Sequence, residues 1–206
     1  MTSIDDITIE VTDTAAAERF YAAAFGLDSR VRLRASAEPA TGFRGFTLSL
    51  ITAQPADVTA LFDAAVEAGA TPLKPVAKSM WGCGAVVAAP DGTIWKIATP
   101  AKKDTGPATG RFDEIVLLLG VADIPASRKF YVEHGLTVAK SFARMYVEFA
   151  AEPGAVKLGL YRRRALAKDA GVPPEGTGSH RITLGGGTFT DPDGFTWEQS
   201  SIAATS

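Results

Sequence analysis

The stretch ITIEVTDTAAAERFYAAAFGL at residues 7–27 decides the fold, because a similar segment, IVLLLGVADIPASRKFYVEHGL, returns at residues 115–136. Each segment opens with an alternating or apolar run, the pattern of a half-buried or buried strand. An aspartate, Asp13 or Asp123, then stands where a helix N-cap is expected. Phe-Tyr and Gly-Leu pairs close both segments, and glycine commonly ends a helix. The chain therefore contains the same strand–helix unit at least twice.

Two further segments repeat in the same order along the chain. PDGTIW at 90–95 resembles PDGFTW at 192–197, and GFTL at 45–48 resembles RITL at 181–184. Pro-Asp-Gly is typical of a tight turn, so the apolar run after it is predicted to be a strand. The spacing between the repeats is uneven. Each half of the chain therefore lacks a piece that the other half keeps.

Some predicted elements occur in only one half of the chain. A helix with an apolar stripe is predicted over 55–68 in the first half only, and a strand pair over 146–149 and 156–161 in the second half only. Residues 101–110 are polar and rich in turn formers, which is typical of a linker. We therefore expect two halves, residues 1–100 and residues 111–206, joined by this linker.

Together these segments resemble the vicinal oxygen chelate superfamily of glyoxalases, bleomycin-resistance proteins and dioxygenases. The segments WGCG at 81–84 and LGLYRR at 158–163 add to the resemblance. It implies an α+β fold in which repeated βαβββ modules form curled mixed sheets around a cleft, with the helices outside. Four modules are expected, beginning near Ile7, Phe46, Ile115 and Ile182. The first is truncated by loss of its terminal hairpin and the fourth by loss of its helix, whereas the second and third are complete.

The resemblance also implies where metal ligands would stand. In the first half these positions fall on Asp6, Arg44 and Lys96. Arginine and lysine offer no lone pair at neutral pH and repel a divalent cation, so the first half is not expected to bind metal.

In the second half the ligand positions fall on Glu114 (Asp113 if the register shifts by one), His180 and Glu198. Two carboxylates and one histidine could hold Fe, Mn, Ni or Zn with open coordination positions. The alternative is that these are ordinary strand-end charges and a solvated histidine in a glycine-rich turn.

Three functions follow from these patterns. The leading hypothesis is a protein without cofactor that binds a small organic molecule in the cleft, like the antibiotic-binding members of the superfamily. The alternative is a metal-dependent lyase, isomerase or extradiol-type dioxygenase using Glu114, His180 and Glu198. The third is a structural partner protein with a closed cleft. The residues expected to contact the ligand are Arg44, Phe46, Trp81, Lys96, Tyr146 and Tyr161.

Bulk properties exclude other classes. The formal net charge of -2 gives no nucleic-acid or polybasic membrane signature. No apolar run reaches membrane-spanning length, no signal peptide is recognisable, and the single cysteine, Cys83, is typical of a cytoplasmic protein. Truncated modules could be completed by a second chain, so a homodimer is expected.

Overall fold

The computed structural model describes residues 3–26 and 28–200, and within them the chain is an α+β protein with two large open sheets and four helices. The predicted fold class is confirmed. Asp13 and Asp123 cap their helices by accepting from the backbone N–H groups of Ala16 (2.9 Å) and Ala126 (3.2 Å). The helices are α1 (Thr14–Phe25), α2 (Pro55–Glu67), α3 (Ile124–Glu133) and α4 (Arg163–Ala170).

The second and third modules form one eight-stranded sheet. Its strands, in spatial order, are β5 (Thr71–Ser79), β6 (Gly82–Ala88), β7 (Ile94–Thr99), β4 (Phe46–Ile51), β8 (Glu114–Val121), β11 (Lys157–Arg162), β10 (Tyr146–Phe149) and β9 (Val138–Phe142). The two modules join where β4 pairs antiparallel with β8, with Leu48 opposite Leu117. In each module the first strand pairs parallel with the last, β4 with β7 and β8 with β11.

The first and fourth modules form a five-stranded sheet. In spatial order its strands are β14 (Phe189–Thr190), β15 (Thr196–Glu198), β13 (Ile182–Gly185), β1 (Asp6–Val11) and β2 (Val31–Ala35). A two-stranded ribbon, β12 (Gly176–Gly178) with β3 (Ala40–Gly42), lies beside it. β2 pairs parallel with β1, as β7 does with β4, so β2 stands in the place of a module's last strand. Both sheets thus combine segments from either side of the predicted linker.

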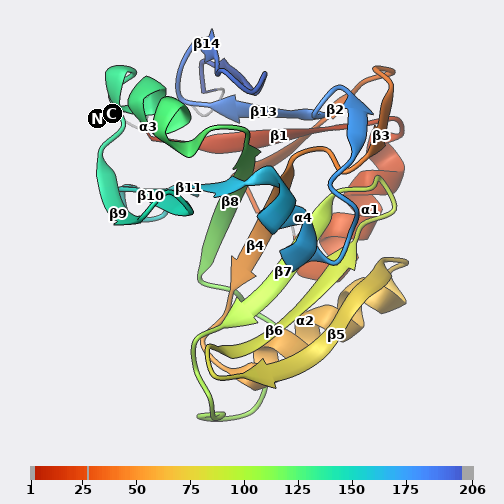
Figure 1. Ribbon diagram of the computed structural model, residues 1–206. Helices are drawn as coiled ribbons and strands as arrows, with labels where there is room; N and C mark the ends of the chain where they lie inside the picture. Colours follow the sequence, from red (N-terminus) through yellow and green to blue (C-terminus); the bar gives the residue numbers. More distant parts are fainter. Residues whose placement is uncertain (1–2, 27, 201–206) are drawn as a thin grey trace, which may run out of the picture.

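One hydrophobic core joins the two sheets. Strand alternation gives the eight-stranded sheet two faces. We call the face that carries Leu117 and Trp95 the outer face, and the face that carries Lys96 and Tyr161, over which α4 packs, the inner face. The outer face packs in one buried cluster with Ile7 of the five-stranded sheet. In Figure 1, β1 and β13 cross the upper end of the larger sheet, and α4 lies in front of that sheet. The described residues include no helix with the length and apolarity to span a bilayer.

The repeated Phe-Tyr pairs tie helices to turns of other modules. Tyr21 of α1 donates to the Asp91 carboxylate (2.6 Å), and Tyr131 of α3 donates to the Asp191 carboxylate (2.7 Å). The next tryptophan after each turn lies against its tyrosine, with ring centroids 5.7 Å and 5.8 Å apart. Burial raises the pKa of both tyrosines well above the usual range, so both hydroxyls stay protonated donors.

Candidate functional site

Three of the predicted ligand-binding residues share the inner face of the eight-stranded sheet. Lys96 of β7 forms an ion pair with Asp169 of α4 (2.8 Å). Tyr146 and Tyr161, from neighbouring strands, face each other with ring centroids 5.6 Å apart. Because α4 packs over this face and its Asp169 holds Lys96, the centre of the predicted cleft is partly covered by the chain itself.

The structure does not bring the other three predicted residues to this face. Phe46 is buried on the outer face, because its position in β4 has the opposite parity to Lys96 in the paired strands. Trp81 stands at the turn between β5 and β6 with 82% of its surface exposed. Arg44 is half-buried and donates to the carbonyl oxygen of Asp91 in the turn before β7. A resemblance between motifs does not determine which face of a strand each residue occupies.

The three residues of the alternative metal site do not converge. Glu114 lies in the eight-stranded sheet, where both its oxygens accept from Lys157 at 2.7 Å. Glu198 lies in the five-stranded sheet and pairs with Arg34 (3.0 Å). Within the described ranges no three His, Cys, Asp or Glu residues are grouped so that they could hold a metal ion. The donor set predicted from the sequence therefore does not fit a metal centre.

His180 has local partners instead. Its two ring nitrogens face backbone carbonyl oxygens, Nδ1 that of Arg44 at 2.5 Å and Nε2 that of Asp193 at 3.0 Å. Its ring stacks on Phe195 with centroids 3.9 Å apart. Neither ring nitrogen faces an open site, so His180 acts as a link between three segments of the fold.

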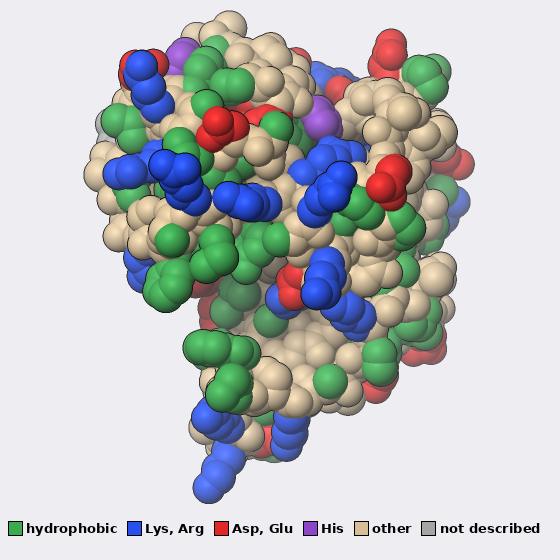
Figure 2. Space-filling model, in the orientation of Figure 1, with side chains coloured by type: hydrophobic (Ala, Val, Ile, Leu, Met, Phe, Trp, Pro, Cys, Tyr) green, Lys and Arg blue, Asp and Glu red, His purple; other side chains and the backbone are tan. Residues whose placement is uncertain are grey.

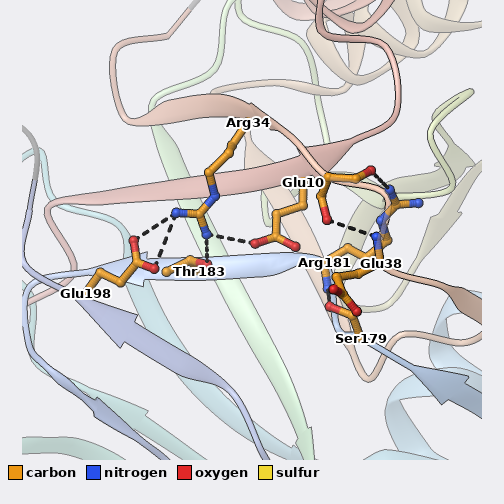
Figure 3. Close-up of polar contacts among 8 residues, drawn as sticks. Glu10, Arg34, Glu38, Ser179, Arg181, Thr183 and Glu198 are labelled. Carbon is orange, nitrogen blue, oxygen red and sulfur yellow. Dashed lines mark hydrogen bonds and ion pairs between the residues drawn. The ribbon is translucent and has the colours of Figure 1, made fainter.

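The open face of the five-stranded sheet carries a network of charges (Figure 3). Arg34 lies between Glu198 and Glu10 and donates to both carboxylates and to the Thr183 hydroxyl (2.7 Å). Arg32, two residues earlier in β2, lies 3.4 Å from the carboxylate of Asp6. Two positions that the resemblance assigned to metal ligands, Asp6 and Glu198, are thus each paired with an arginine. The alternation VRLR at 31–34 was the sequence signal of this charged face.

A pocket of about 330 Å³ lies between the two sheets, on the side opposite the predicted cleft. We call it the inter-sheet pocket. One wall comes from α1 and β2, and the other from the outer faces of β4, β7 and β8. Its lining residues are Glu18, Tyr21, Phe25, Gly26, Asp28, Val31, Arg32, Leu33, Leu50, Trp95, Phe112 and Ile115.

The polar groups of the inter-sheet pocket are few and mostly engaged. The Tyr21 hydroxyl donates to Asp91 and receives a 3.4 Å contact from the indole N–H of Trp95. Asp28 is bound by Arg30, whose hydrogen bonds lower the pKa of that carboxyl. The pocket is therefore an apolar and aromatic chamber whose charged lining residues are already paired or exposed to solvent.

Comparison with solved structures gives the class of fold. A variant of glyoxalase I from Zea mays superimposes with a TM-score of 0.59 at 14% identity, over 95% of this chain and 92% of that chain. A candidate dioxygenase from Bacillus subtilis superimposes with a TM-score of 0.54 at 11% identity, over 91% of this chain and 71% of that chain. No family model and no curated protein matches the sequence.

The chain therefore has the repeated-module fold that these glyoxalase I and dioxygenase structures share. The resemblance noted in the sequence is supported at this level. Sequence identities this low establish the fold, whereas the chemistry depends on this chain's own residues.

Proposed function

We propose that the protein binds a small, flat, largely apolar organic molecule in the inter-sheet pocket, without a metal ion. The observation that carries this proposal is a pocket of about 330 Å³ whose walls include Tyr21, Phe25, Trp95 and Phe112. Small-molecule sites are typically concave, mostly apolar and of about 300–1,000 Å³. Aromatic walls favour a ring-containing ligand, which can stack or pack edge-on against them.

The chemistry of the lining favours binding over catalysis. Among the residues that the structure describes, no histidine or cysteine lines the pocket, and its charged members are Glu18, Asp28 and Arg32. The single cysteine, Cys83, is buried in β6, where burial raises the pKa of its thiol and disfavours the nucleophilic thiolate. The lyase, isomerase or dioxygenase alternative required Glu114, His180 and Glu198 to hold one metal ion, and the two glutamates lie in different sheets.

The test is the binding of 2-naphthol, a flat probe of suitable size, followed by the three indole N–H signals in a two-dimensional NMR spectrum. Trp95 lines the pocket, whereas Trp81 is exposed and Trp197 is buried in the five-stranded sheet. We expect saturable shifts of the Trp95 signal alone. Leu33→Trp should fill the pocket from β2 and weaken binding by about tenfold or more.

The matched control is Leu73→Trp, which adds the same bulk at a half-buried leucine of β5, away from the pocket. It should leave 2-naphthol binding unchanged. Equal shifts of all three tryptophan signals, or equal losses in both variants, would contradict the proposal.

The expected homodimer stays a proposal. Trp81 is exposed at the turn between β5 and β6, and Phe142 at the turn between β9 and β10, the corresponding ends of two modules. A second copy of the chain could cover these apolar tips. Sedimentation analysis should then give twice the chain mass, and a concentration-independent monomer would rule the dimer out.

A further inference from the structure

A second cavity, on another part of the molecule, has a different chemistry. β8 and β11 are parallel, and Val121 pairs with Arg162, so both strands end at the same edge of the sheet. The start of α3 follows the first and α4 follows the second. A groove of about 730 Å³ opens there, which we call the arginine groove. Its lining residues are Val121, Ala122, Asp123, Ile124, Pro125, Arg144, Arg162, Arg163 and Arg164.

Three of these arginines are available to a ligand. Arg144, Arg162 and Arg164 are exposed, and none of them forms an ion pair with an acidic residue in the part of the chain that the structure describes. Figure 2 shows Lys and Arg side chains gathered in a row across the upper half of the molecule. This local charge contrasts with the net charge of -2 for the whole chain.

The remaining charges of the groove are already engaged. Arg163 donates to the backbone oxygens of Pro174 and Phe43 and lies 5.2 Å from the centroid of the Phe43 ring, so it supports the structure. Asp123, the acidic residue of the lining, accepts the N–H of Ala126 as the cap of α3. Asp123 thus serves its helix as a cap, and the groove lining holds four arginines against this one carboxylate.

One hydrogen bond links two of the three exposed arginines. The Nε of Arg162 donates to the backbone oxygen of Arg144 (3.2 Å), which places the two residues side by side. Like charges so close together repel, and a bound anion of matching valence removes that repulsion. No side chain caps the first turn of α4, so its backbone N–H groups add to the positive potential.

We propose that the arginine groove binds a polyvalent oxyanion, the phosphoryl groups of a small phosphorylated molecule. Guanidinium groups donate two parallel hydrogen bonds to phosphate oxygens, and three guanidinium groups match an anion with more than one negative charge. The groove shares no lining residue with the inter-sheet pocket, so this site does not depend on the function proposed above.

The test is a calorimetric titration of the full chain with pyrophosphate at low ionic strength, where attraction between exposed charges is least screened. We expect a single site with a dissociation constant below about 1 mM, and a loss of about tenfold or more in Arg162→Gln/Arg164→Gln. The control is Lys103→Gln/Arg111→Gln, which removes the same charge from exposed positions near the linker.

Each outcome decides the proposal. No pyrophosphate binding, or an equal loss in the control variant, would overturn it, because the second result would indicate general attraction to positive charge. Succinate binding as tightly as pyrophosphate would overturn the phosphoryl assignment. If the double variant fails to fold by circular dichroism, Arg144→Gln, in the turn between β9 and β10, replaces it. The same weakening of pyrophosphate binding is expected.

Discussion

Trp197→Ala is expected to lower the free energy of unfolding by about 3–5 kcal/mol. Trp197 is only 1% exposed in β15. Its ring stacks on Phe189 with centroids 4.9 Å apart and lies 5.8 Å from the ring of Tyr131. Truncation removes these contacts and leaves a cavity between the five-stranded sheet and α3 that the rigid surroundings cannot fill. Urea unfolding at constant pH measures the change.

Trp81→Ala is the matched control for this experiment. It makes the same substitution at a side chain that is 82% exposed, so the change should stay within about 0.5 kcal/mol. A destabilisation of similar size in both variants would mean that Trp197 is not packed as the structure shows.

Tyr131→Phe should lower the free energy of unfolding by about 2–3 kcal/mol at neutral pH, because a buried carboxylate loses a donor. The Tyr131 hydroxyl donates to Asp191 at 2.7 Å. The backbone N–H groups of Asp193 and Phe195 remain as donors to that carboxylate, at 3.0 Å and 2.8 Å. Tyr146→Phe removes a hydroxyl that donates to Glu148 at a half-exposed site and should cost less than about 1 kcal/mol.

The effect of Tyr131→Phe should depend on pH. Burial raises the pKa of Asp191 above its unfolded value, so the protonated carboxyl favours folding at low pH, and that contribution is lost as pH rises through the folded pKa. The Tyr131 hydrogen bond lowers this pKa, so its removal raises the pKa further. The difference in unfolding free energy between wild type and variant should therefore be larger at pH 7 than below about pH 4. A difference independent of pH would contradict the assignment.

Local features of the fold could be read from the sequence. Asp13 and Asp123 are the predicted caps, and the helix predicted over 55–68 is α2 (Pro55–Glu67). These features depend on residues close together in the chain. Which modules pair could not be predicted, because a contact such as Ile9 with Ile182 leaves no local pattern.

The candidate site was harder to predict for a similar reason. The inter-sheet pocket is formed by α1, β2 and three strands of another sheet. Tyr21 and Trp95 belong to the repeated segments, but no local pattern shows that they line one pocket. Phe46 was assigned to the cleft although strand parity places it in the core. Lys96, Tyr146 and Tyr161 were also assigned to the cleft, and their strands place them on one face of the eight-stranded sheet.

The pairing of β1 with β13 has a consequence for how the protein reaches this structure. The eight-stranded sheet is built from one continuous stretch, residues 46–162, whose neighbouring strands mostly follow one another in the chain. β1 is synthesised before β13, so one edge of β1 stays uncovered until β13 pairs with it. Pairing between strands so far apart in the chain gives a high contact order, which slows folding. During translation β1 would therefore expose an unpaired edge, the kind of surface that can associate with another chain.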